Sequence, residues 1–318
     1  MNTCIVAGGA GFIGSHLCKR LLEDGNKVLC IDNLSTGAKE NIESLRENEN
    51  FSFLEHDVLK MLPNSYSADF VFHLASPASP NHHSPKSYHA LAMETMMVNT
   101  QGTLSLLEFA SKNNAKFLFA STSEVYGDPL EHPQKEEYRG NVSTTGPRSV
   151  YDEAKRFGET LVAYYSREKN LDGKIARIFN TYGPNMLKED MRMIIVFINS
   201  ALKNEPLTIF GDGSQTRSLC FVSDTVEGLV RLMFYPNTKG EVVNIGSGEE
   251  HTVLEYANIV KELTNSQSEI VFSEALPQDD PMRRRADTQK AKRILQWETK
   301  VSLNEGLGKM IEYFKNQI

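Results

Sequence analysis

The chain has 318 residues, 40% of them hydrophobic and 24% charged, which is ordinary for a globular protein with one large domain or two smaller ones. Its net charge of −7 argues against a nucleic-acid or anionic-membrane partner, so a polyanionic ligand would need a local group of cations. Four cysteines without C-x-x-C spacing, no signal peptide before the first strand and no membrane-length apolar run predict a cytoplasmic protein with reduced thiols.

A strand, a glycine-rich turn and a helix are predicted at the start of the chain. Thr3–Ala7 is an apolar run, residues 8–14 carry four glycines, and leucines at helical spacing follow. Such glycines allow a tight turn and close approach of a pyrophosphate, while the helix N-terminus offers free N–H groups to its charge. We therefore expect a dinucleotide to contact Gly8, Gly11, Phe12, Ile13 and Gly14.

The second strand indicates which dinucleotide is bound. Lys27–Asp32 ends in an acid about 20 residues after the glycine turn, where it can hydrogen-bond the adenosine ribose. Asp32 would repel a 2′-phosphate, and no arginine follows closely to receive one, so NAD is favoured over NADP. The further contacts expected in this loop are Asn33, Ser35, Thr36 and Gly37.

Strands and helices then alternate, which is typical of a Rossmann-type, doubly wound parallel sheet. We predict strands at residues 51–57, 69–75, 116–120 and 174–179, and helices at 88–112 and 151–169. Residues at the carboxyl ends of parallel strands face the cofactor crevice. The cofactor contacts expected there are Asp57, Val58, Leu74, Ala75 and Ser76.

The alternation loosens after about residue 180. Shorter segments such as 207–213 and 241–245 predict a smaller mixed α/β lobe over the substrate, and 301–314 predicts an amphipathic helix. We expect an NAD-binding domain at 1–180 and a mainly substrate-binding lobe at 181–318, interleaved with the first.

Tyr151 and Lys155 are the candidate catalytic pair. Residues four apart share one face of a helix, so the ammonium of Lys155 can lie beside the phenol of Tyr151 and favour its ionised form. Both side chains would also contact the cofactor. The spacing alone is common on solvated helix faces, so the interpretation depends on the other motifs.

Seven motifs together resemble the extended short-chain dehydrogenase/reductase superfamily, in its nucleotide-sugar branch, over nearly the whole chain. Within that branch the sequence most resembles the UDP-glucuronate decarboxylases. The motifs are 8–17 (GGAGFIGSHL), 73–80 (HLASPASP), 121–129 (STSEVYGDP), 146–149 (GPRS), 151–153 (YDE), 176–184 (ARIFNTYGP) and 211–218 (GDGSQTRS).

The resemblance implies an NAD-dependent lyase that converts UDP-glucuronate to UDP-xylose. Tyr151 would take the proton of the sugar 4-hydroxyl while NAD accepts the C4 hydride, and the resulting β-keto acid would lose CO₂ before the hydride returns. Thr122 would hydrogen-bond the 4-oxygen, and Ser123 and Glu124 would lie by C5. Arg284 aligns with the active-site arginine of the decarboxylases.

Binding of the UDP-sugar needs cations and polar groups near the cofactor. Arg217 and Arg284 are candidates for the diphosphate because arginine forks suit phosphate oxygens, and Arg192 is a third. Alternatively, Arg284 belongs to a solvated run, 283–285, paired with Asp279 and Asp280. By resemblance, Asn180 meets the diphosphate, and Pro77 and Lys86 border the sugar. No metal is expected, because His82, His83 and His89 lack carboxylate or cysteine partners at suitable spacing.

Three other functions stay open. Sugar 4,6-dehydratases carry Asp-Glu where this chain has Ser123-Glu124, which suits decarboxylation better but does not exclude dehydration, because Glu124 alone can remove the C5 proton. Because the segment 81–99 is unusual, a UDP-N-acetylglucosamine or UDP-hexose 4,6-dehydratase is the first alternative. A 4-epimerase is the next, and a non-catalytic nucleotide-sugar or NAD sensor is the last.

By family analogy we expect a homodimer through a four-helix bundle built from the helices at 88–112 and 151–169.

Overall fold

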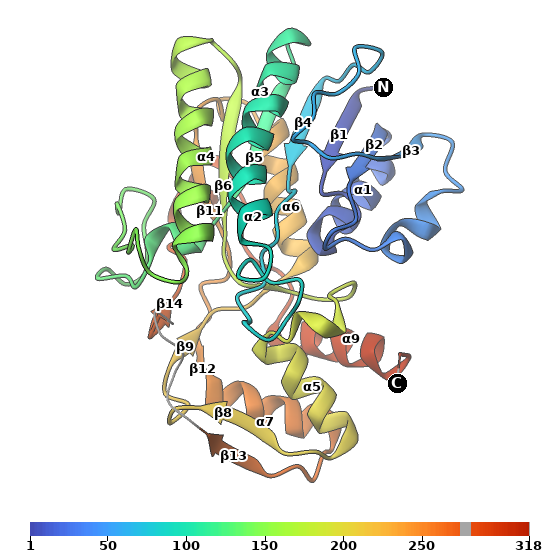
Figure 1. Cartoon of the computed structure of the whole chain (residues 1–318). Helices are drawn as coiled ribbons and strands as arrows, with labels where there is room; N and C mark the ends of the chain where they lie inside the picture. The colour runs from blue at the N-terminus through green and yellow to red at the C-terminus, as the bar shows by residue number, and fades with distance from the viewer. Residues whose placement is uncertain (274–280, 318) are drawn as a thin grey trace.

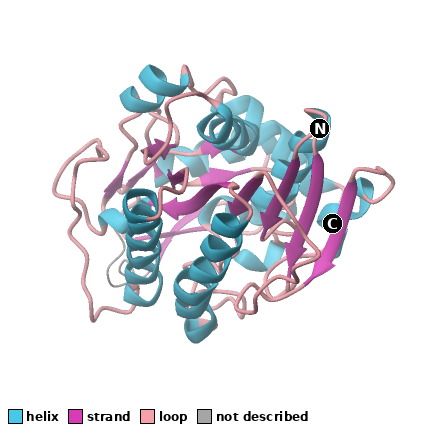
Figure 2. Ribbon diagram, turned by 90° about the horizontal axis from the view of Figure 1, so that it is seen from above, coloured by secondary structure: helices cyan, strands magenta, loops and turns pink. Residues whose placement is uncertain are grey.

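A computed structural model describes residues 1–273 and 281–317 and contains a seven-stranded sheet covered by helices on both faces (Figures 1 and 2). All neighbouring strands of this sheet pair in parallel. Their order is β11 (Val242–Ile245), β6 (Gly173–Ile178), β5 (Lys116–Thr122), β4 (Phe70–His73), β1 (Thr3–Ala7), β2 (Lys27–Asp32) and β3 (Phe51–Glu55). The predicted Rossmann-type sheet is confirmed.

The sheet is buried on both faces because its strands are almost continuously apolar, as expected for a parallel sheet. Cys4 and Val6 of β1 point to the face covered by α1 (Phe12–Glu23) and α6 (Val222–Phe234). Ile5 and Ala7 point to the opposite face, which is covered by α3 (Thr103–Lys112) and α4 (Ser149–Glu168). This period of two explains why one short strand serves two cores.

The helix predicted at 88–112 begins later than expected and is not α-helical throughout. It consists of α2 (Ala92–Met97), a π-helical turn at Val98–Gly102 and α3. Tyr88 lies before α2 because its backbone N–H bonds to the Ser79 carbonyl, 3.0 Å away, instead of to a helical turn. Tertiary pairing therefore overrides the local helical pattern at residues 88–91.

The segment predicted with the smaller lobe at 241–245 is instead β11, the edge strand of the large sheet beside β6. The remaining C-terminal elements lie below the carboxyl ends of the large sheet (Figure 1). The helices there include α5 (Met193–Lys203), α7 (Val253–Thr264) and α9 (Leu303–Lys315), which is the predicted amphipathic helix. α8 (Gln289–Leu295) instead packs beside β11 and α6. The division at residue 180 stays a prediction.

The other strands form small separate sheets. β7 (Thr181–Tyr182) pairs with β10 (Cys220–Phe221), and β8 (Leu207–Phe210) pairs with β13 (Ile270–Ser273). β9 (Thr216–Arg217) lies between β12 (His251–Thr252) and β14 (Arg283–Arg284). 3₁₀ helices occur at Lys39–Leu45, Ser123–Tyr126 and Lys188–Asp190.

The four cysteines have free thiols and are buried, as the sequence indicated for structural residues. In the ranges that the structure describes, no helix has the combination of length and hydropathy needed to cross a membrane.

Candidate active site

A cavity of about 870 Å³ lies between the carboxyl ends of the large sheet and the smaller lobe. The glycine turn and the ends of β2, β4 and β5 form one wall, and residues of α4, α5 and β9 form others. Such a crevice at the strand ends is the usual ligand site of an open parallel sheet.

The glycine turn fits a dinucleotide closely. Gly8 has φ +80°, and a Cβ there would lie 2.6 Å from the backbone nitrogen of Ala75. A Cβ on Gly14 would lie 2.0 Å from the Gly8 carbonyl oxygen, so only hydrogen is tolerated at that position. No side chain caps the N-terminus of α1 at Gly11, so its backbone N–H groups are left to meet a pyrophosphate.

Asp32 lies at the end of β2 on the cavity wall, where an adenosine ribose would be received. Its carboxylate accepts hydrogen bonds from the backbone N–H groups of Ala10, at 3.0 Å, and Leu34, at 2.8 Å. Burial nevertheless raises the pKa of Asp32 above its ordinary value, because desolvation outweighs these bonds. The expected cofactor contact Gly37 is not part of the wall, but a Cβ there would lie 2.9 Å from the Asp32 carboxylate, so a larger residue at this position would disturb the aspartate.

The other expected cofactor contacts all reach the cavity. They are Gly8, Gly11, Phe12, Ile13, Gly14, Asn33, Ser35, Thr36, Asp57, Val58, Leu74, Ala75, Ser76, Tyr151 and Lys155. Their positions fit NAD along the strand ends, while each individual contact stays a prediction.

Tyr151 and Lys155 share the face of α4 that looks onto β5. The Lys155 ammonium donates to the carbonyl of Ala120 at 2.7 Å and lies 5.8 Å from the centroid of the Tyr151 ring. Burial lowers the pKa of Lys155 to about 7, against an opposing effect of Glu159. The helix geometry predicted for the pair is therefore correct.

The expected lowering of the Tyr151 pKa is not found without a ligand. Burial raises the pKa of this phenol above its ordinary value, and a hydrogen bond with Thr122 only partly offsets it. The physical reason is that Tyr151 is 6% exposed, so desolvation of a phenolate dominates. A deprotonated Tyr151 would need positive charge from the bound cofactor in addition to Lys155.

Thr122, Ser123 and Glu124 follow directly from β5. The hydroxyl of Thr122 accepts a hydrogen bond from the backbone N–H of Glu124 at 3.2 Å, which turns the chain into the 3₁₀ turn at Ser123–Tyr126. Ser123 is buried, and all three residues line the cavity. The predicted catalytic triplet is thus presented by a capped strand end next to Tyr151.

Glu124 lies between two arginines. Arg148 Nη2 is 2.5 Å from Glu124 Oε2, and Arg284 Nη1 bonds the other carboxylate oxygen. Burial by itself raises the pKa of Glu124, but Arg148 and Arg284 outweigh it, and the pKa falls to about 2. The two arginines therefore stabilise the ionised form of Glu124.

The alternative of a solvated arginine run is wrong for Arg284. This residue is 3% exposed and also donates to the Gly127 carbonyl at 2.8 Å. Arg283 is exposed, and Arg285 lies 3.5 Å from Glu250. Asp279 and Asp280, the expected partners of the run, lie outside the described residues.

Arg148 was missed as a site residue, although the sequence carried a signal for it. It stands in the GPRS motif and precedes Tyr151 by three residues, which places the two on one side of the helix start. Tyr88 was also missed, and its position beside Tyr151 has no local sequence signal.

The candidate substrate residues Pro77, Lys86, Asn180, Arg192 and Arg217 also line the cavity. Arg192 lies 3.2 Å from Asp190 and donates to the Ala78 carbonyl at 3.2 Å, while Arg217 donates to the Thr216 carbonyl at 2.8 Å. His82 stacks on His89 at 3.6 Å between ring centroids. Within residues 1–273 and 281–317 there is no group of three or more potential metal ligands.

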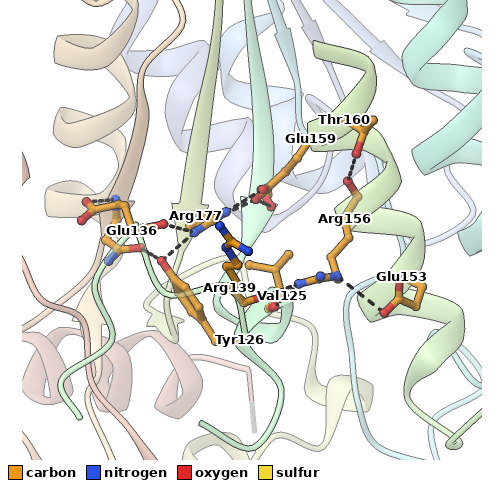
Figure 3. Close-up of polar contacts among 11 residues, drawn as sticks. Val125, Tyr126, Glu136, Arg139, Glu153, Arg156, Glu159, Thr160 and Arg177 are labelled. Atoms are coloured by element: carbon orange, nitrogen blue, oxygen red, sulfur yellow. Dashed lines mark hydrogen bonds and ion pairs between the residues drawn. The ribbon is translucent and has the colours of Figure 1, made fainter. Parts of the chain in front are cut away.

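A buried polar network supports the site from behind (Figure 3). Arg177 of β6 binds both carboxylate oxygens of Glu159 in α4, at 2.9 and 2.8 Å, and the Ser121 hydroxyl donates to the same carboxylate at 2.6 Å. Arg177 also donates to the hydroxyl of Tyr126 at 3.0 Å. Nearby, Arg156 donates to the carbonyls of Val125 and Arg139, both at 2.9 Å. These bonds fix α4, which carries Tyr151, against β5, which carries Thr122.

Comparison with known proteins agrees with this geometry. The chain is 47% identical over 316 residues to UDP-glucuronic acid decarboxylase 1 of Danio rerio, covering 99% of this chain and 73% of the relative. It is 48% identical over 317 residues to UDP-glucuronic acid decarboxylase 2 of Arabidopsis thaliana, covering 99% and 68%. The solved UDP-glucuronic acid 4-epimerase of Bacillus cereus, in complex with UDP-glucuronic acid and NAD, superimposes with a TM-score of 0.87 at 31% identity, over 99% of this chain and 100% of that one.

The family model described as "NAD dependent epimerase/dehydratase family" matches residues 4–246, which include the glycine turn, Thr122–Glu124 and the Tyr151–Lys155 pair. The predicted resemblance to the nucleotide-sugar branch and the prediction of NAD as cofactor are confirmed. This chain belongs to the NAD dependent epimerase/dehydratase family.

Proposed function

We propose that this protein converts UDP-glucuronate to UDP-xylose and CO₂, with NAD regenerated in each turnover. The observation that carries the proposal is the group formed by Glu124, Arg148 and Arg284 beside Tyr151. Two guanidiniums face one carboxylate, so the group offers charged hydrogen-bond donors that suit a second carboxylate, that of the substrate. The identity to decarboxylases over almost the whole chain supports the same substrate.

The first step removes hydrogen from C4 of the sugar. NAD, when bound, accepts the C4 hydride and later returns it. Tyr151 takes the proton of the 4-hydroxyl, and Thr122, which hydrogen-bonds Tyr151, keeps the 4-oxygen and the phenol in line. Lys155 donates a hydrogen bond to the Ala120 carbonyl, which holds its charge 5.8 Å from the Tyr151 ring centroid. There the charge favours the ionised phenol that accepts the proton.

The second step breaks the C5–carboxylate bond. The 4-ketone makes the substrate a β-keto acid, and the electron pair of the broken bond is delocalised onto the 4-oxygen as CO₂ leaves. Ser123 stands where a dehydratase carries an acid, and its neutral hydroxyl does not repel the carboxylate. A proton then adds at C5, and C4 is reduced to give the UDP-pentose.

The diphosphate needs cations outside the reacting ring. Arg192 and Arg217 reach the cavity from the smaller lobe, with Asn180 at the end of β6, and we assign them to the UDP moiety. Pro77 and Lys86 would border the sugar from the β4 side.

The test is a product analysis with the purified protein and NAD. UDP-glucuronate should lose the mass of CO₂ and yield UDP-xylose, and Tyr151→Phe should lower turnover by about 10² to 10⁴ while it still binds NAD. UDP-glucose and UDP-N-acetylglucosamine are the matched substrates without a carboxylate and should not lose water. Intact UDP-glucuronate after incubation with the folded, NAD-loaded enzyme would contradict the proposal.

A second candidate is 4-epimerisation of UDP-glucuronate, favoured by the similarity to a solved enzyme of that name. This reaction shares the oxidation at C4. The 4-keto sugar must then rotate in the pocket, so that the hydride returns to the opposite face of C4. Its product has the same mass as the substrate, so the same assay separates the two reactions.

We also propose a homodimer through α2, α3 and α4, which lie side by side on one face of the sheet (Figure 1). Large apolar side chains are exposed on these helices, namely Met93, Leu104, Phe157 and Tyr164. Light scattering should give twice the chain mass, and a charged substitution at Phe157 should yield monomers.

A cytoplasmic location is also part of the proposal, since free, buried cysteines fit a reducing compartment. Fractionation of cells tests this location.

A further inference from the structure

Tyr88 and Tyr151 form a face-to-face pair inside the cavity. Their ring centroids are 4.8 Å apart and the ring planes differ by only 7°. Tyr88 is 1% exposed, so its ring is a fixed surface on one side of the Tyr151 phenol.

Further ring contacts lead away from Tyr151 through the segment 80–91, with the Tyr88 and His89 rings tilted by 48° and the His89 and His82 rings stacked. The Tyr88 ring lies 4.4 Å from that of His89, whose own ring lies 3.6 Å from His82. Aromatic contacts of this kind hold rings in a defined orientation beyond the effect of burial alone.

Backbone and side-chain bonds anchor this segment to the smaller lobe. Tyr88 N donates to the Ser79 carbonyl at 3.0 Å, and the Ser79 hydroxyl donates to the Asp190 carbonyl at 3.0 Å. Asn81 donates to the Met191 carbonyl, also at 3.0 Å. The position of the Tyr88 ring is therefore fixed from outside α4, independently of the helix that carries Tyr151.

The hydroxyl of Tyr88 contributes nothing visible to this arrangement. It is buried and has no hydrogen-bond partner among residues 1–273 and 281–317. Burial raises the pKa of Tyr88 above its ordinary value, against an opposing effect of Arg148, so the phenol stays neutral. The stacking face of the ring is thus the part of the residue in contact with the catalytic phenol.

We propose that Tyr88 is a positioning residue for Tyr151, whose ring holds the phenol in the orientation in which its oxygen meets the sugar 4-hydroxyl. The inference rests on the proposed oxidation at C4 but applies whichever reaction follows it. The α4 backbone fixes only the Cα of Tyr151, and the ring retains two side-chain torsions that the Tyr88 face restricts. Small displacements of a reacting group lower the rate strongly, because the reacting atoms must start in near-attack geometry.

The test compares Tyr88→Leu, which removes the stacking face, with Tyr88→Phe, which keeps the face and removes the hydroxyl. Single-turnover formation of NADH is followed with UDP-glucuronate as substrate. Tyr88→Leu should slow hydride transfer by about tenfold or more and enlarge the isotope effect of C4-deuterated substrate, with NAD and UDP affinities within about threefold of the wild type. Tyr88→Phe should restore the rate to within about threefold of the wild type.

Two results would overturn the inference. One is an unchanged hydride-transfer rate in folded Tyr88→Leu, and the other is an equal loss in Tyr88→Phe, which would assign the role to the hydroxyl. Circular dichroism checks folding, and Tyr88→Met replaces Tyr88→Leu if the latter does not fold. Failure of the proposed function is a separate result, because wild-type enzyme would then form no product from UDP-glucuronate, and the comparison would be made with the UDP-sugar that it does oxidise.

Discussion

Arg148, at the start of α4, lies 2.5 Å from the carboxylate of Glu124, which follows the end of β5. The contact joins the element that carries Tyr151 to the turn that carries Ser123. Arg284 binds the other oxygen of the same carboxylate from 160 residues further along the chain. The reacting end of the cavity is therefore organised around one anion and two cations.

Arg148→Gln should lower turnover of UDP-glucuronate by about 10²-fold, because it removes a preorganised charge and frees Glu124 to move. The pKa of Glu124, now about 2, should rise when one of its two cations is lost, so the acidic limb of the pH–rate profile should move to higher pH. Arg148→Lys keeps the charge and should therefore lose less activity than Arg148→Gln. A profile identical to that of the wild type, with a rate within about threefold, would show that Arg148 is not part of the site.

Lys155→Met should stabilise the ligand-free protein in a pH-dependent way. Burial lowers the pKa of Lys155 from 10.5 to about 7, so between these pH values the unfolded chain binds the additional proton and stability rises with pH. The cost of the buried charge is complete below about pH 7 and disappears as pH approaches 10.5. Differential scanning fluorimetry should give a higher Tm for Lys155→Met at pH 6, and a difference that narrows toward pH 10. A gap that is constant with pH would contradict the assignment.

Arg177→Met should lower the free energy of unfolding by about 3 kcal/mol, because it leaves the Glu159 carboxylate buried without its cation. Both side chains are largely buried, with 14% and 13% exposed. The double variant Arg177→Met/Glu159→Leu should recover much of the loss, since no unpaired charge remains. Urea unfolding of the two single variants and the double variant measures the coupling, and additive losses would show that the pair is not coupled.

Asp32→Asn should weaken NAD binding by about tenfold, because an amide cannot accept two ribose hydroxyl bonds as the carboxylate does. Removal of the negative charge should also narrow the preference for NAD over NADP. Calorimetry on nucleotide-free protein gives both dissociation constants. Unfolding temperature without nucleotide is the control, because Asp32 also binds the backbone of Ala10 and Leu34. An unchanged ratio of the NAD and NADP dissociation constants would show that another residue selects NAD over NADP.

Local sequence patterns were sufficient for much of this protein. The glycine spacing at residues 8–14, the acid at Asp32 and the alternation of apolar runs predicted a Rossmann-type sheet and NAD, because these depend on backbone conformation and on the two periodicities of side chains. The i, i+4 spacing placed Tyr151 and Lys155 on one helix face for the same reason. The residues proposed for catalysis and substrate binding all reach the cavity. For Thr122, Ser123 and Glu124 the reason is that strand ends in a parallel sheet meet at one edge.

Only the tertiary structure decided the relations between distant segments. It joined Arg284 to Glu124, stacked Tyr88 on Tyr151 and placed β11 at the edge of the large sheet. It also made the predicted helix begin at Ala92 instead of at Tyr88. It also reversed the expected direction of the Tyr151 pKa, since burial, which no local pattern reports, outweighs the hydrogen bond with Thr122 and the charge of Arg192. Contacts across many residues and desolvation arise from packing of the whole chain, whereas turns, caps and helix faces are determined by neighbouring residues alone.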